Sequence, residues 1–153
     1  MRLTSVRYTS LVEGRDVIER PDVLFVCPHG AAKSVIAAAY CRQLAAERGI
    51  VLRVASAGTE PEPAVPPPVV AALASEGIDL SEYRPRQLTR EDIARAGQVI
   101  TIGCDVSEFA SAGKPIERWD DVPLVSDGLE AARVAIRTHV VRLLDGWEGE
   151  RHG

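Results

Sequence analysis

Residues 23–34 (VLFVCPHGAAKS) are the segment best suited to chemistry, because a short apolar run ends in Cys27 and a loop of small residues leads to Lys33 and Ser34. The apolar run predicts a buried strand, and the residues after the loop have the alanine-rich pattern of a long helix. Backbone N–H groups in such a loop form a concave anion site, and the helix dipole favours negative charge there. The same field favours the thiolate form of a cysteine. A thiolate in an oxyanion cradle is suited to attack on phosphate or a phosphate-like oxyanion.

The size and composition of the chain predict one globular domain, since it has 153 residues, of which 46% are hydrophobic and 26% charged. The net charge of -4 argues against nucleic acid or an anionic membrane as the main partner. No apolar run approaches the roughly 20 residues of a membrane span, and residues 1–22 lack the pattern of a secretory signal. Three cysteines, Cys27, Cys41 and Cys104, are too few for a disulfide framework. We therefore expect a cytoplasmic protein.

Predicted strands and helices alternate along residues 22–148, which follow an N-terminal extension of residues 1–21. The patterns predict strands at 23–27, 50–55, 98–103 and 116–119, helices at 34–48 and 69–77, a third helix capped by Thr89 with Asp92, a last helix capped by Ser126 or Asp127, a turn at 56–59 and a surface loop at 77–87. This alternation predicts an α/β fold with a four-stranded parallel sheet and helices on both faces. Ligands of such sheets bind beyond the carboxyl ends of the strands, where the strand order switches. Cys27 lies at such a strand end.

The site segment resembles that of the low-molecular-weight protein tyrosine phosphatase family. That family has a cysteine, five residues, an arginine and a serine directly after the first strand; here Cys27 and Ser34 are in register, with Lys33 at the arginine position. The resemblance covers about residues 23–145 and implies a flavodoxin-like three-layer domain with Cys27 as the nucleophile. It further implies an oxyanion-binding loop formed by His29, Gly30, Ala31, Ala32, Lys33 and Ser34. The segments SAGT at 56–59, GIDLSEYRPRQLT at 77–89 and VITIGC at 99–104 also match the family.

The loop at residues 28–32 (PHGAA) is more similar to that of the family's arsenate reductase branch than to that of its phosphatases. Cys104 matches the second cysteine of this branch, which implies a thiol that attacks the arsenic adduct of Cys27 and resolves it. The third cysteine of the thioredoxin-linked reductases has no counterpart, and Glu108 stands near its position. The reaction would then finish through a small thiol or a disulfide between Cys27 and Cys104. The resemblance implies no bound cofactor and no metal, but a thiol reductant of the thioredoxin, glutaredoxin or mycothiol type.

Two departures from the family pattern concern catalysis. Lysine is a point charge and cannot make the two parallel hydrogen bonds with which the family's arginine holds the oxyanion. The family also has an Asp-Pro loop whose aspartate protonates the leaving oxygen, but in residues 119–127 (WDDVPLVSD) no carboxylate immediately precedes Pro123. Asp121 or Asp127 would replace that acid only if the loop took an unusual path. General acid catalysis contributes about 10²–10⁴-fold, so its loss would cripple ester hydrolysis.

Several of these residues also have a structural interpretation. Cys27 and Cys104 could be core cysteines, Ser34 could cap the helix, and His29 could be a solvated loop residue. Asp121 and Asp127 could be surface or capping residues, and Cys41 is expected to serve packing. These readings stay open at the level of the sequence.

Three functions fit the sequence. The first is an arsenate reductase-like enzyme with weak phosphatase activity. The alternative is a catalytically impaired phosphatase-like module that binds arsenate, phosphate, sulfate or a phosphorylated partner without turnover, which the lysine and the missing acid favour. A phosphocarrier similar to the cysteine-type sugar-transport subunits ranks last, because residues 56–59 and 77–79 fit the phosphatase family instead. A redox protein is the expected partner of the first function.

Overall fold

The computed structural model describes residues 6–7, 20–109 and 113–152. Most of the predicted extension at residues 1–21 lies outside the described residues. Within it, Val6–Arg7 form the short strand β1, which pairs in parallel with β4, Ile78–Asp79. The boundary between extension and domain stays a prediction.

The central sheet has four parallel strands, as predicted. They are β2 (Val23–Cys27), β3 (Val54–Gly58), β5 (Gln98–Thr101) and β6 (Ile116–Arg118), in the spatial order β3-β2-β5-β6. The chain passes from β2 to a neighbour on one side and later returns to its other side, so the strand order switches at β2. Ligands of doubly wound sheets bind beyond such a switch point. Cys27, the last residue of β2, therefore lies where the fold predicts a ligand.

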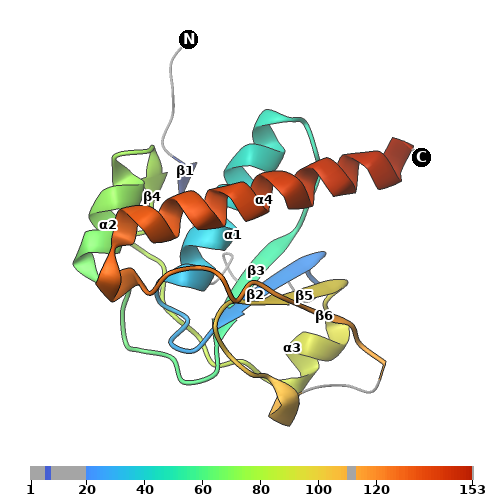
Figure 1. Ribbon diagram of the computed structural model, residues 1–153, viewed down its shortest axis with the longest axis horizontal. Helices are drawn as coiled ribbons and strands as arrows, with labels where there is room; N and C mark the ends of the chain where they lie inside the picture. Colours follow the sequence, from blue (N-terminus) through green and yellow to red (C-terminus); the bar gives the residue numbers. More distant parts are fainter. Residues whose placement is uncertain (1–5, 8–19, 110–112, 153) are drawn as a thin grey trace.

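Helices cover both faces of the sheet, which confirms the three-layer α/β fold (Figure 1). Helices α1 (Lys33–Glu47) and α4 (Leu129–His152) lie on one face, α3 (Arg90–Arg95) lies on the other, and α2 (Pro67–Ala74) lies beside β4. Residues from Ser34 to Cys41 are all buried, because α1 lies between the sheet and α4. A helix that is apolar on all sides is stable only in such a place. The capping box of α3, between Thr89 and Asp92, is confirmed.

Three local expectations were wrong. Strand β3 covers 54–58 rather than 50–55, so most of the predicted turn at 56–59 is strand. The predicted surface loop at 77–87 contains β4 and three buried side chains, Ile78, Leu80 and Tyr83. Helix α4 begins at Leu129 and is preceded by Gly128, so neither Ser126 nor Asp127 is its cap. Ser126 and Asp127 belong instead to a 3₁₀ turn, η2 (Val125–Asp127).

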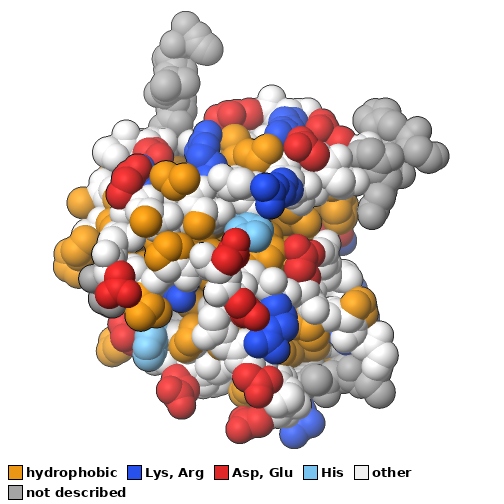
Figure 2. Space-filling view, in the orientation of Figure 1, with side chains coloured by type: hydrophobic (Ala, Val, Ile, Leu, Met, Phe, Trp, Pro, Cys, Tyr) orange, Lys and Arg blue, Asp and Glu red, His pale blue; other side chains and the backbone are white. Residues whose placement is uncertain are grey.

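The surface carries charges of both signs, and on the face shown in Figure 2 acidic and basic side chains are interspersed. Among the described residues, no helix combines the length and the apolar character needed to cross a membrane.

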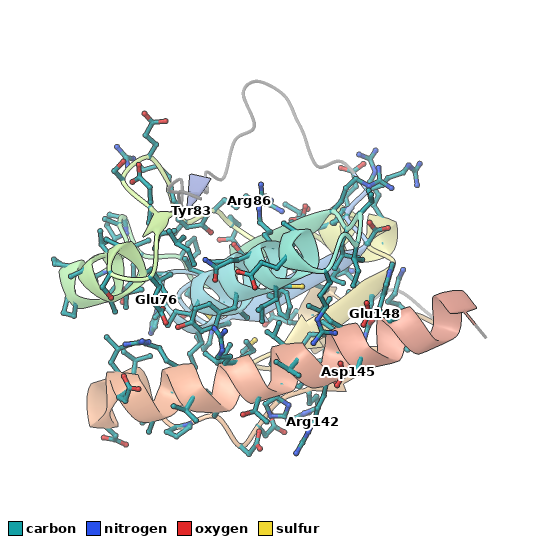
Figure 3. The ribbon with its side chains drawn as sticks, turned by 90° about the horizontal axis from the view of Figure 1, so that it is seen from above. Glu76, Tyr83, Arg86, Arg142, Asp145 and Glu148 are labelled. Atoms are coloured by element: carbon teal, nitrogen blue, oxygen red, sulfur yellow. The ribbon has the colours of Figure 1, made fainter. Side chains whose placement is uncertain are left out.

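A hydrogen-bonded cluster joins α1 and α4 to Glu76, which follows α2 and is labelled in Figure 3. The Tyr40 hydroxyl donates to one Glu76 oxygen at 2.7 Å, and the Arg133 guanidinium donates to the other at 3.1 Å. Arg133 also donates to the Tyr40 oxygen at 3.1 Å. Burial, followed by the hydrogen bond to Glu76, raises the pKa of Tyr40 to about 12. Glu76 thus holds two donors that have little access to water.

We expect Glu76→Ala to lower the free energy of unfolding by about 1–3 kcal/mol, because it leaves the half-buried Tyr40 hydroxyl without its acceptor and removes one of the two carboxylates paired with Arg133. Urea denaturation followed by circular dichroism measures this loss. The control is Glu91→Ala, which removes an exposed carboxylate paired with Arg95 on the surface of α3 and should leave the denaturation midpoint nearly unchanged. Equal midpoints for the two variants would contradict a structural role for the Glu76 cluster.

Candidate active site

The two ends of the loop at residues 27–34 meet at the Cys27 sulfur. Cys27 is 2% exposed, and its Sγ accepts the Ser34 backbone N–H at 3.3 Å. The thiol in turn donates to Ser34 Oγ at 3.1 Å. Ser34 is the second residue of α1 and does not cap it, because the N-cap is Ala32 and has no side-chain hydrogen bond. The first turn of the helix therefore directs a backbone donor and a hydroxyl at the sulfur.

The loop packs closely against the end of β3. Gly30 has φ of +60°, and a Cβ built on Gly58 would lie only 2.5 Å from the Gly30 nitrogen. The loop carbonyls of Cys27, Pro28 and His29 accept hydrogen bonds from the backbone N–H groups of residues 59, 60 and 62. Among the described hydrogen bonds, none has a backbone N–H of residues 29–32 as donor. Carbonyls turned outward and N–H groups left without acceptors are what an anion site requires.

Lys33 extends from the start of α1 toward the end of β5. A Cβ on Gly103 would lie 3.1 Å from Lys33 Nζ, and Gly103 has φ of +72°. Both the backbone conformation and the space therefore favour glycine at this position. Gly103 was not identified from the sequence, although a glycine directly before Cys104 was the available signal.

Cys104 lies on the same edge of the sheet as Cys27 and Lys33. Its thiol is partly buried and donates to the carbonyl oxygen of Val26 at 3.6 Å. Burial and the negative charge of Cys27 raise its pKa to about 11, and the charge of Lys33 opposes this shift. The structure thus brings the two predicted site cysteines and the lysine within electrostatic reach of one another. Cys41 is buried in α1, and burial raises its pKa to about 12, as expected for a packing residue.

Removal of the Cys27 charge is expected to lower the pKa of Cys104, because that charge is one of the causes that raise it. In Cys27→Ser, alkylation of Cys104 by iodoacetamide should therefore begin at lower pH than in the wild type. Rates measured between about pH 7 and pH 11, with peptide mass spectrometry to assign the cysteine, test this. Cys41→Ser is the control and should not move the Cys104 profile. An unchanged profile in Cys27→Ser would show that the two sulfurs do not interact.

His29 lies on the outside of the loop. Its exposed ring is 3.4 Å from the Glu60 carbonyl oxygen and 3.7 Å from Glu62 Oε2, both measured to Nδ1. The side chain is thus positioned to orient the loop against residues 60–62. Ala31 is buried, and Ala32 stands directly before α1. The oxyanion-binding roles of these residues stay predictions.

The two candidate acids occupy different places. Asp121 Oδ1 lies 2.7 Å from His139 Nε2, and the His139 ring stacks on Trp119 with 4.5 Å between centroids. The hydrogen bond from His139 lowers the pKa of Asp121, which keeps the proton that a general acid needs off this carboxyl. This geometry does not favour Asp121 as the displaced acid. Asp127 is exposed in η2, and its catalytic role stays a prediction.

Comparison with known proteins agrees with this fold. Residues 22–118 match the family model of the low molecular weight phosphotyrosine protein phosphatases. A Halobacterium salinarum protein described as "Putative arsenate reductase" is 29% identical over 130 residues, which are 79% of this chain and 89% of that protein. The thioredoxin-dependent arsenate reductase of Corynebacterium glutamicum is 29% identical with a TM-score of 0.74, covering 86% of this chain and 63% of that longer one.

The solved arsenate reductase of Archaeoglobus fulgidus is 30% identical, with a TM-score of 0.61 over 80% of this chain and 98% of that one. The family match extends over more than half of the chain, from the residue before β2 to the last residue of β6. This chain belongs to the low molecular weight phosphotyrosine protein phosphatase family, in which it is similar to arsenate reductases.

Proposed function

We propose that this protein is an arsenate reductase in which Cys27 attacks arsenate and Cys104 resolves the adduct. The observation that carries the proposal is the position of Cys104, whose thiol donates to the carbonyl oxygen of Val26, the residue before Cys27. Cys104 also follows Gly103, which lies beside Lys33 Nζ. Phosphate ester hydrolysis makes no use of a second thiol there. The similarity to arsenate reductases supports the same choice.

In the first step the Cys27 thiolate attacks arsenic, an S–As bond forms, and one arsenate oxygen leaves as water after taking up protons from solvent. The remaining oxygens lie against the backbone N–H groups of residues 29–32, with Lys33 supplying positive charge. Arsenate exchanges its oxygen ligands readily, so this step tolerates the absence of a carboxylate immediately before Pro123. The loss of the Cys27 charge in the adduct also removes one cause that raises the pKa of Cys104.

In the second step the Cys104 thiolate attacks Cys27 Sγ. The S–S bond forms, the S–As bond breaks, and its electron pair stays on arsenic, which leaves as arsenite. The two thiols lose two electrons and As(V) gains them. A thiol reductant of the thioredoxin, glutaredoxin or mycothiol type then restores both thiols, and the thioredoxin dependence of the Corynebacterium relative supports such a donor.

A single-turnover experiment tests the proposal. The reduced protein is mixed with arsenate, denatured in iodoacetamide and mapped by mass spectrometry; phosphate in place of arsenate is the control. We expect a disulfide between Cys27 and Cys104, with alkylation confined to Cys41. Alkylation of all three cysteines after arsenate treatment would refute the reductase and leave the alternative, a module that binds the oxyanion without turnover.

Weak phosphatase activity is a separate part of the proposal, and a double variant tests it. Lys33→Arg restores bidentate oxyanion binding, and Val122→Asp places a carboxylate immediately before Pro123, where the family has its acid. Together we expect them to raise hydrolysis of para-nitrophenyl phosphate by about 10²-fold, the lower end of general acid catalysis. Each single variant is a control. No gain in the double variant would show that the loop geometry, rather than the two residues, limits hydrolysis.

A further inference from the structure

The ammonium group of Lys33 has no partner among the described residues. Lys33 is the first residue of α1, where the helix dipole disfavours a positive charge. None of the described hydrogen bonds and ion pairs involves its side chain, whereas the other lysine, Lys114, donates to the carbonyl oxygen of Ala96. A cation at the positive end of a helix lowers stability unless an anion compensates it. We therefore looked for the negative charges on which Lys33 acts.

The side chain of Lys33 reaches the residues that follow β5. Its Nζ lies 3.1 Å from the position that a Cβ on Gly103 would occupy, and Gly103 directly precedes Cys104. Because Gly103 has no side chain, the ammonium has room at this place. The Cys104 thiol donates to the carbonyl oxygen of Val26 at 3.6 Å, so its sulfur lies near the carboxyl end of β2. The ammonium and the Cys104 thiol therefore lie at the same edge of the sheet.

The charged groups around Cys104 leave Lys33 as the cation that favours its thiolate. Burial, the charge of Cys27 in β2 and the charge of Asp105 raise the pKa of Cys104, and the charge of Lys33 lowers it. Arg118 of β6 lines a cavity of about 200 Å³ together with Cys104, but its guanidinium is already paired with a neighbouring carboxylate. Two negative charges thus oppose the Cys104 thiolate, and one uncompensated cation supports it.

We propose that Lys33 stabilises the thiolate of Cys104 and thereby promotes its attack on Cys27 Sγ in the second step. The use of this interaction rests on the proposed function, which supplies that step. Cys104 gives its proton to solvent, its sulfur forms the S–S bond, and the electron pair of the broken S–As bond stays on arsenic. In the arsenic adduct Cys27 carries no negative charge, so the ammonium acts on one sulfur instead of two.

A lysine is suited to both steps of the proposed reaction. Its ammonium is a point charge on a flexible stem, whereas the planar guanidinium of an arginine is fixed by two parallel hydrogen bonds to the oxyanion. The ammonium of Lys33 can therefore act on the oxyanion in the first step and on Cys104 in the second. The lysine at the arginine position thus supports the resolving thiol as well as the oxyanion.

The first test measures the ionisation of Cys104 without arsenate. In the Cys27→Ser background, Lys33→Met removes the ammonium and nearly keeps the size of the side chain. We expect alkylation of Cys104 by iodoacetamide to begin at higher pH than in Cys27→Ser alone, and its rate at about pH 9 to fall about 3–10-fold. Lys114→Met in the same background is the matched control and should leave the profile unchanged. Equal profiles with and without Lys33 would overturn the proposal.

Salt distinguishes an effect of charge from an effect of packing. Raising the ionic strength from about 0.05 M to about 0.5 M screens charges, so the gap between the profiles of Cys27→Ser and its Lys33→Met variant should narrow. A gap of unchanged size would mean that the methionine altered the packing around Cys104, and would overturn the proposal.

The second test follows disulfide formation with both cysteines present. Diamide adds to one cysteine, and the sulfur of the other displaces the reduced diamide, so the disulfide forms without an oxyanion. With excess diamide we expect Lys33→Met to slow this reaction by about the same factor as the alkylation of Cys104, and Lys114→Met to match the wild type. An unchanged rate in Lys33→Met would overturn the role of Lys33 in the second step.

The wild type separates this proposal from the reductase itself. A Cys27–Cys104 disulfide that forms with diamide but not with arsenate would refute the reductase alone, and the alkylation profiles would still decide whether Lys33 stabilises the Cys104 thiolate. No disulfide with either oxidant would overturn both the reductase and the role of Lys33 in its second step.

Discussion

Cys104→Ser is expected to reduce multiple-turnover arsenate reduction to background while leaving oxyanion binding intact. The serine keeps the size of the side chain but cannot form the disulfide that expels arsenite. Cys104 lies outside the oxyanion loop, and its thiol donates to the carbonyl oxygen of Val26 in β2. Arsenite release measures the activity, and protection of Cys27 from iodoacetamide by phosphate measures binding.

The matched control is Cys41→Ser, since Cys41 is the remaining cysteine and packs within α1. It should lower stability, because it places a hydroxyl in an apolar site, but any folded fraction should still turn over arsenate. Arsenate reduction by Cys104→Ser at the wild-type rate with a small thiol as donor would contradict the resolving role of Cys104. The small thiol would then release arsenite from the Cys27 adduct directly.

Local signals were sufficient to predict the elements that carry the nucleophile. The side chains of residues 23–27 are buried on both faces of the sheet, and a strand in that position is apolar at every residue rather than at every second one. The continuous apolar run therefore predicted a central parallel strand. The capping box at Thr89 and Asp92 was also predictable, because it depends on two residues that are only three positions apart in the sequence. Cys27 was assigned to the site because a strand end, a small-residue loop and a helix start follow one another within twelve residues.

Features that depend on distant contacts were not predictable from these signals. Ser56, Ala57 and Gly58 suggested a turn because they are small, yet they belong to β3, and Gly58 is small because the backbone of the oxyanion loop lies against it. The same holds for Asp121, whose pairing with His139 joins two segments of the chain that no local pattern relates. The cavity beside Cys104 arises only when β6 lies next to β5. Sequence patterns thus located the nucleophile, and the tertiary structure determined what surrounds it.

Gly58→Ala is expected to disrupt the oxyanion site by displacing the backbone of the loop at residues 29–30. The added Cβ would lie 2.5 Å from the Gly30 nitrogen and 2.7 Å from the His29 carbonyl carbon, and backbone atoms cannot move aside as a flexible side chain would. The loop must therefore shift relative to Cys27 and the start of α1. Overpacking of this kind costs about 1–3 kcal/mol, and a displacement of about 1 Å in a site lowers activity by about 10²-fold. Urea denaturation measures the first effect and arsenite release the second.

Gly146→Ala is the control, because it makes the same glycine-to-alanine change at a position where the added methyl group meets no neighbouring atom. Gly146 lies in α4 with no atom within 4 Å of its Cβ position, so alanine should leave activity unchanged and stabilise the helix slightly. The decisive measurement is protection of Cys27 from iodoacetamide by phosphate. Gly58 is not among the glycines with positive φ, so its backbone conformation accepts alanine without strain. A loss of Cys27 protection in Gly58→Ala is therefore due to the steric overlap of the added Cβ with the loop. Full protection in Gly58→Ala would mean that the loop binds oxyanions in a conformation away from β3.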